Sequence, residues 1–154
     1  MGKDMIIGIS SDHGGFELKQ KIHDYLVNQG YEIRDMGCFD HDSVDYPDYA
    51  ILVGEGIKNG EIHRGIIICG TGIGISISAN KIPGVRAALC HDVYTARMSR
   101  EHNNANILAL GGRTTGKNIS LRIVEEFMTA KFAGGRHERR VDKIRQIEEK
   151  YKKS

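Results

Sequence analysis

Apolar residues fall into short runs that alternate with stretches of helical spacing. The runs predict five strands, because each is short, rich in isoleucine, valine, leucine or alanine, and bounded by turn residues; they lie at 5–10, 31–36, 66–68, 85–90 and 106–110. Between the runs, apolar residues recur every three or four positions, which predicts helices beginning near 16, 47, 73, 91 and 115. After Gly134 and Gly135, a last and highly charged helix is predicted over 136–152.

Strict alternation of strands and helices predicts an α/β fold with one parallel sheet and helices on both of its faces. The alternation of apolar and polar residues in 31–36 is imperfect, which suits an edge strand. Right-handed crossovers place the carboxyl ends of all strands at the same edge of the sheet. We call the end of the sheet where the carboxyl ends of the strands lie the carboxyl edge, and the end where their amino ends lie the amino edge.

Length, net charge and cysteine content exclude some classes of function. The chain of 154 residues is expected to form a single domain over 1–154, and its net charge of +2 is too small to argue for nucleic-acid binding. Three cysteines without a recognisable signal peptide favour a reducing, cytoplasmic setting. No apolar run approaches 18 residues, so no membrane span is expected.

The stretch 64–81 carries the strongest chemical signal. A β-branched run ends at Cys69, and Gly70, Gly72 and Gly74 then allow a tight turn before a helix that starts at about Ile73. Open α/β sheets bind ligands at such a point, where free N–H groups favour a thiolate and a developing anion. The residues alone leave two interpretations open: a thiolate base or nucleophile beside an anion cradle, or a small buried cysteine before a packing turn. The glycine spacing matches neither nucleotide-binding fingerprint.

Other polar residues are predicted at the same carboxyl edge. Asp12 and His13 follow the first strand and Arg113 follows the fifth, so they should meet Cys69 and Thr71 there. Asp12 and His13 can bind a hydroxyl group as acceptor and donor, although a simple turn with an exposed histidine explains them equally well.

His102 follows a helix end and joins that group only if its loop folds back or a second subunit supplies it. Arg136 and Arg140 are four residues apart on one helix face, which suits a phosphate, with a solvated basic face as the alternative. The basic tail lacks the interleaved aromatic residues of a nucleic-acid binder. No ligand spacing typical of a metal site is present.

Several motifs together resemble the type B ribose-5-phosphate isomerases, the RpiB/LacAB sugar-phosphate isomerase family. They are S-D-H-G-G, D-Y-P-D-Y-A, C-G-T-G-I-G-I-S-I-S-A-N-K, S-R-E-H-N-N-A-N, G-G-R at 111–113 and G-G-R-H-E-R-R-V, and the match extends to about residue 148. The resemblance implies a Rossmann-like three-layer α/β/α sandwich around a five-stranded parallel sheet, with an extra C-terminal helix. It also implies a dimer, or a dimer of dimers, with active sites at the interface.

The implied activity is cofactor-free interconversion of ribose 5-phosphate and ribulose 5-phosphate through an enediolate. Isomerisation of allose or galactose 6-phosphate, a non-catalytic phosphosugar-binding module, and a cysteine-dependent transferase or hydrolase stay open as alternatives. Neither metal, nucleic acid nor membrane is expected as a partner.

The resemblance also implies a role for each matching residue. Cys69 is the base, Thr71 assists it, and His102 is the acid that opens the sugar ring. The remaining matches are substrate contacts: the sugar-binding Asp12, His13 and Asn103, the oxyanion cradle of Gly70, Gly72, Ile73 and Gly74, and the phosphate-binding Arg113, Arg136 and Arg140.

Overall fold

The computed structural model describes residues 2–152 and contains one parallel sheet. Its five strands are β1 (Ile6–Ser11), β2 (Glu32–Asp35), β3 (Arg64–Cys69), β4 (Ala87–Leu89) and β5 (Ile107–Gly111). They pair in the order β2-β1-β3-β5-β4, and every pair is parallel. The prediction of a five-stranded parallel sheet with 31–36 at its edge is therefore confirmed.

Six helices connect and follow the strands. They are α1 (Phe16–Asn28), α2 (Tyr46–Lys58), α3 (Ile73–Ala79), α4 (Val93–Glu101), α5 (Lys117–Thr129) and α6 (Arg136–Tyr151). Two short 3₁₀ turns, η1 (Gly2–Asp4) and η2 (His13–Gly15), were not predicted. The predicted elements are all present, with ends that differ by a few residues.

One difference is β4 (Ala87–Leu89), which is shorter than the predicted 85–90. The side chain of Asn80 occupies the outer edge of this strand: its Oδ1 accepts a hydrogen bond from Ala87 N at 2.8 Å, and its Nδ2 donates to Ala87 O at 3.0 Å. The side chain of Asn106 likewise accepts from Arg86 N at 2.8 Å, in place of a strand partner. Amide side chains thus satisfy backbone groups at the unpaired outer side of β4 and directly before its first residue.

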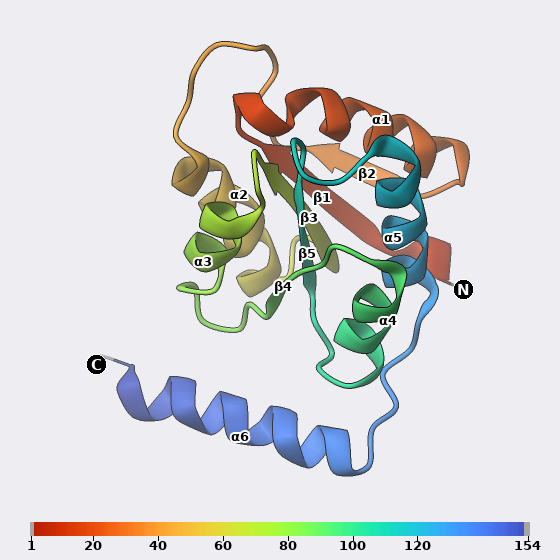
Figure 1. The fold of residues 1–154 in the computed structure, drawn as a ribbon. Helices are drawn as coiled ribbons and strands as arrows, with labels where there is room; N and C mark the ends of the chain where they lie inside the picture. Colours follow the sequence, from red (N-terminus) through yellow and green to blue (C-terminus); the bar gives the residue numbers. More distant parts are fainter. Residues whose placement is uncertain (1, 153–154) are drawn as a thin grey trace.

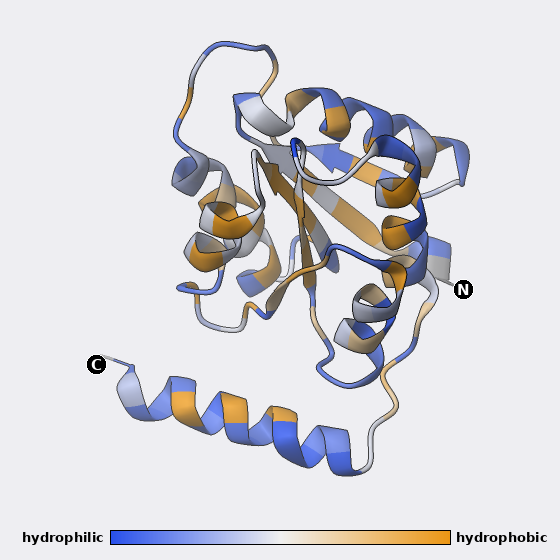
Figure 2. Ribbon diagram, viewed as in Figure 1, coloured by the Kyte–Doolittle hydropathy of each residue, from blue (hydrophilic) through white to orange (hydrophobic). Residues whose placement is uncertain are grey.

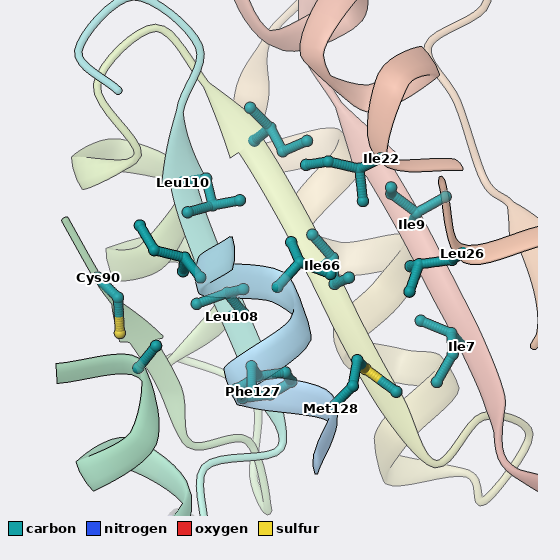
Figure 3. Close-up of a cluster of buried hydrophobic side chains, with 14 of the residues drawn as sticks. Ile7, Ile9, Ile22, Leu26, Ile66, Cys90, Leu108, Leu110, Phe127 and Met128 are labelled. Carbon is teal, nitrogen blue, oxygen red and sulfur yellow. The ribbon is translucent and has the colours of Figure 1, made fainter. Parts of the chain in front are cut away.

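Helices α1, α4 and α5 cover one face of the sheet, and α2 and α3 cover the other (Figure 1). Alternate strand residues face opposite layers. Isoleucines and leucines of β1, β3 and β5 pack against α1 and α5, among them Ile9, Ile66 and Leu108 (Figure 3). The intervening residues Ile67 and Cys69 pack on the side of α2 and α3. Burial of both faces confirms the three-layer sandwich.

Helix α6 lies apart from these layers, along the amino edge of the sheet (Figure 1). Most of its surface is polar (Figure 2), and Val141 is its only residue that is fully buried. Ile144 and Ile147 keep 44% and 60% of their surface exposed. One anchor to the main body is Glu148, whose carboxylate accepts from Gly84 N at 3.0 and 3.1 Å. Within residues 2–152, no helix is both long and apolar enough to cross a lipid bilayer.

Candidate active site

The turn between β3 and α3 holds the thiol of Cys69 against a backbone donor. Cys69 is the last residue of β3 and is 4% exposed. Gly72 N donates a hydrogen bond to Cys69 Sγ at 3.1 Å. Gly72 has a φ of +80°, and a Cβ atom at this position would lie 2.5 Å from Leu89 Cδ1, so only glycine fits. The glycine spacing therefore serves to direct an N–H group at the sulfur.

The polar residues predicted at the carboxyl edge do meet there. Asp12 N donates to Ile68 O at 3.1 Å, which joins the loop after β1 to the end of β3. Gly112 N and Arg113 N donate to Cys69 O and Gly70 O at 2.8 and 2.9 Å, which joins the loop after β5 to the same point. Three consecutive neighbours in the sheet thus bring their loops together around the cysteine.

The side chains in these loops are oriented by local hydrogen bonds. Asp12 is buried, and its Oδ1 accepts from Gly15 N at 3.2 Å, so the carboxylate caps the η2 turn. Thr71 Oγ1 accepts from Ile73 N at 3.2 Å, and both residues are exposed. The exposed Arg113 reaches back over the turn, with Nη1 3.1 Å from the point where a Cβ of Gly70 would stand.

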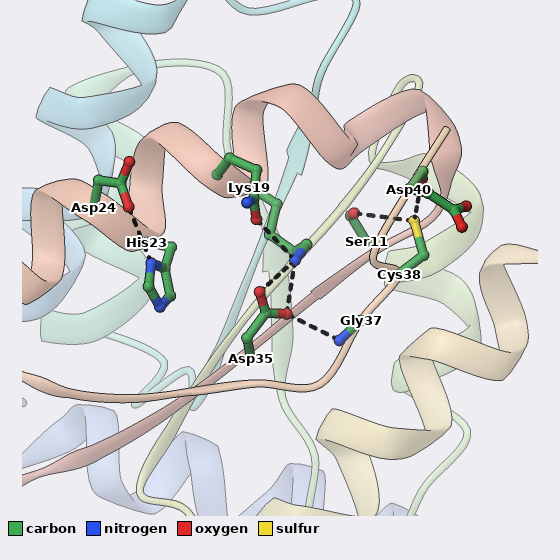
Figure 4. Close-up of polar contacts among 9 residues, drawn as sticks. Ser11, Lys19, His23, Asp24, Asp35, Gly37, Cys38 and Asp40 are labelled. Carbon is green, nitrogen blue, oxygen red and sulfur yellow. Dashed lines mark hydrogen bonds and ion pairs between the residues drawn. The ribbon is translucent and has the colours of Figure 1, made fainter. Parts of the chain in front are cut away.

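His13 receives its orientation from the loop 36–45. Val44 N donates to His13 Nδ1 at 3.2 Å, so a neutral ring carries its proton on Nε2, where it can be donated to a sugar oxygen. The start of the loop is fixed by Lys19, a fully buried lysine whose Nζ lies 2.6 Å from both carboxylate oxygens of Asp35 (Figure 4). Asp35 Oδ1 also accepts from Gly37 N at 3.0 Å. The sequence analysis did not find this support, since Lys19 reads as an ordinary surface residue of a helix.

Tyr46 is a second residue that the sequence analysis did not single out. A Cβ on Gly74 would lie 2.5 Å from Cζ of Tyr46 and 2.9 Å from its hydroxyl, so the phenol covers the start of α3 beside the cysteine turn. Its side chain is 40% exposed and thus borders the opening. The motif D-Y-P-D-Y-A contains Tyr46, but the sequence pattern there indicates only the start of a helix near Pro47.

A second group of candidate residues gathers at the amino edge, where α4 ends and α6 begins. The rings of His102 and His137 are stacked, with centroids 4.1 Å apart and planes at 9°. Desolvation of its ring, followed by the nearby charges of His102, Arg136 and Arg140, lowers the pKa of His137. His137 is therefore neutral at pH 7, which lets it stack on the histidine predicted to act as an acid. Asn103 is exposed and lines the groove beneath α6.

Within one chain the two groups do not meet. Cys69 and its neighbours lie at the carboxyl edge of the sheet, whereas His102, Arg136 and Arg140 lie with α6 at the amino edge (Figure 1). The loop after α4 does not fold back toward Cys69: Arg100 Nη1 holds it by donating to Asn104 Oδ1 at 2.9 Å. The structure therefore does not contain the first route left open for His102, in which this loop folds back to Cys69 of the same chain.

Known proteins have similar sequences and the same architecture. The family described as Ribose/Galactose Isomerase matches residues 7–144. The chain belongs to this family. A ribose-5-phosphate isomerase B of Escherichia coli is 44% identical over 144 residues, which are 94% of this chain and 97% of the relative.

Solved structures of the family superpose closely. Ribose-5-phosphate isomerase B of Clostridium thermocellum has a TM-score of 0.95 and 58% identity over 96% of this chain and 100% of its own. The enzyme of Mycoplasma genitalium, solved with bound ribulose 5-phosphate, has a TM-score of 0.89 and 42% identity over 94% and 96% of the two chains. The resemblance inferred from the motifs is therefore confirmed.

The geometry predicts different reactivity for two of the buried thiols. Burial raises the pKa of Cys90, which leaves little thiolate at pH 7, whereas Cys69 receives the N–H of Gly72. Iodoacetamide at pH 7 is expected to alkylate Cys69 faster than Cys90, because the raised pKa of Cys90 reduces the thiolate with which the reagent reacts. Peptide mass spectrometry over time measures both rates. Equal rates, or faster modification of Cys90, would contradict the assigned environment.

Proposed function

We propose that this member of the family is an aldose-ketose isomerase that interconverts ribose 5-phosphate and ribulose 5-phosphate. The observation that carries the proposal is the Cys69 thiol, held by a backbone N–H at the carboxyl edge and flanked by Asp12, His13 and Arg113. The relatives named as ribose-5-phosphate isomerases support it, as does the ribulose 5-phosphate bound to the Mycoplasma genitalium enzyme.

The reaction follows from a base and an oxyanion cradle on the same turn. Cys69, as thiolate, removes the proton from C2 of the open aldose, and the electron pair forms the C1–C2 double bond of the enediolate while charge moves to O1. Backbone N–H groups of Gly70 to Gly74 stabilise that charge, and Thr71 assists the transfer between O1 and O2. The thiol then returns the proton to C1, which gives the ketose with no net change in atoms or electrons.

Sugar phosphates exist mainly in their ring forms, so an acid must open the ring beside this base. A phosphate-binding site must also hold the substrate there. His102 suits the acid, since a histidine can give and take a proton near neutral pH. Arg136 and Arg140 suit the phosphate, and Asn103 lies beside them as a sugar contact. All four lie at the amino edge, away from the Cys69 of their own chain.

A homodimer resolves this separation. We infer that the amino-edge group of one chain faces the carboxyl-edge group of its partner, so that two-fold symmetry completes two equal sites. Apolar side chains are exposed at both places: Ile73 and Ile77 are 52% and 57% exposed beside the cysteine turn, and Ile147 is 60% exposed on α6. The groove of about 810 Å³ beneath α6 provides a further surface against which the second chain can pack.

The cellular setting is part of the same proposal. Cys38, Cys69 and Cys90 are all free thiols, which suits a reducing compartment. We place the activity in the cytoplasm, in the metabolism of pentose phosphates.

A panel of substrates tests the proposal and its alternatives. Ribose 5-phosphate, allose 6-phosphate, galactose 6-phosphate and plain ribose are each followed by a coupled assay for the ketose. The account predicts the highest kcat/KM for ribose 5-phosphate and only slow turnover of ribose. A preference for a six-carbon sugar phosphate would change the assigned substrate but keep the protein an isomerase of the same family. Binding of the phosphates without turnover of any would favour a non-catalytic module.

A further inference from the structure

A second basic pocket opens on the side of α5 and contains no residue of the candidate active site. Its volume is about 560 Å³, within the range of small-molecule sites. Four cationic side chains and two aromatic side chains line much of it: Lys3, Arg64, Arg100, Lys131, Tyr31 and Phe132. None of the described residues that line it is acidic. A pocket lined by several positive charges and no negative charge is suited to bind an anion.

Arg64 is the clearest sign of a missing partner. It is the first residue of β3, and its guanidinium is partly buried, which lowers its pKa. Its Nη1 is buried without a hydrogen-bond partner in the part of the chain that the structure describes, and it has no carboxylate within ion-pair distance there. One favourable contact is the ring of Phe127, whose centroid lies 5.9 Å from Cζ. Burial of an arginine without an anion is unfavourable.

Arg100 repeats this pattern beside it. The residue is 4% exposed, its Cζ lies 6.0 Å from the centroid of the same Phe127 ring, and its Nε is buried and unpaired among residues 2–152. Nη1 donates to Asn104 Oδ1 and, at 2.5 Å, to Ala105 O. Only the other N–H groups of the guanidinium therefore remain for another ligand. Burial, together with the charges of Arg64 and Arg86, lowers the pKa of Arg100 to about 10, so it stays protonated at pH 7. Two cations therefore share one aromatic ring.

We propose that this pocket binds a small organic anion whose phosphate or carboxylate group pairs with Arg64 and Arg100. Lys3 and Lys131, both exposed, stand at the opening and attract the charge. Tyr31 and Phe132 provide a surface for an apolar or aromatic part of the ligand. The site is distinct from the proposed phosphate site on α6 and does not depend on the isomerase proposal.

Calorimetric titration tests the pocket with three probes: phenyl phosphate, benzoate and phenol. The protein is the full chain carrying Arg136→Ala and Arg140→Ala, so that the phosphate site on α6 contributes nothing. Phenyl phosphate, benzoate or both are expected to bind once per chain, and phenol is expected not to bind. The stronger of the two anions identifies the preferred group.

Variants of the pocket decide where the anion binds. Arg64→Met in the same background should weaken binding by about tenfold or more, the loss expected for one charge-assisted hydrogen bond. Lys131→Ala, an exposed change that leaves the fold intact, should weaken it by about threefold, which is within the range for one exposed charge pair. Arg122→Ala, an exposed change on α5 outside the pocket, is the matched control. Absence of anion binding, or binding that neither Arg64→Met nor Lys131→Ala weakens, would overturn the proposal.

Discussion

Replacing Cys69 by alanine is expected to lower kcat/KM for ribose 5-phosphate by about 10²- to 10⁴-fold, the range for losing a general acid-base catalyst. The substitution removes the one sulfur that receives the N–H of Gly72, and neither Asp12 nor Thr71 can replace a thiolate at that point. KM should change little, because the sugar and phosphate contacts remain. Steady-state kinetics in both directions provide the measurement.

Cys90→Ala is the matched control for this change. Cys90 is also a buried cysteine, but burial raises its pKa and no glycine turn surrounds it, so activity should stay close to that of the unchanged chain. The far-ultraviolet circular dichroism of Cys69→Ala should match that of the unchanged chain, which separates lost chemistry from lost fold. Near-normal turnover by the folded Cys69→Ala variant would show that Cys69 is not the base.

The second large effect concerns the phosphate. Arg136→Ala and Arg140→Ala are each expected to raise KM for ribose 5-phosphate about 10- to 100-fold, since a hydrogen bond to a charged group contributes roughly 1.5–3 kcal/mol. Both residues are exposed in the single chain and close enough to His137 to lower its pKa, so their charges converge on one place. The double variant should lose about 10²- to 10⁴-fold if the two contributions add. Turnover of plain ribose should not change, because that sugar has no phosphate to lose.

Arg139→Ala controls for the general positive charge of α6. It removes an equally exposed arginine that lies between the two in sequence and points about 100° away from Arg140 around the helix axis. KM should then stay within about twofold, as expected for an isolated surface charge. Equal losses on phosphorylated and plain sugar in the Arg136 and Arg140 variants would instead assign these arginines a structural role.

Local patterns were sufficient to predict the sheet and most of what surrounds Cys69. Consecutive β-branched residues predict a strand buried on both faces, and glycines at alternate positions after it predict a turn, because both depend on neighbours in the sequence. The meeting of Asp12, Cys69 and Arg113 followed from the handedness of crossovers alone.

What the sequence could not predict depends on contacts between distant segments. The stacking of His102 on His137 requires α6 to pass the end of α4, and the helical periodicity of α6 says nothing about its direction. The ion pair of Lys19 with Asp35 is equally invisible, since the buried position of Lys19 is set by how α1 lies on β2. For the same reason, one sequence could not decide whether His102 joins its own Cys69 or that of a partner.

The central claim, an active site that two chains complete together, is tested most directly by mixing two inactive variants. In a heterodimer of Cys69→Ala and His102→Ala chains, one site carries both substitutions and the other carries neither. Random exchange makes about half of the dimers mixed, each with one intact site, so the mixture should regain about a quarter of the unchanged activity. Activity that never exceeds that of the separate variants would contradict the shared site.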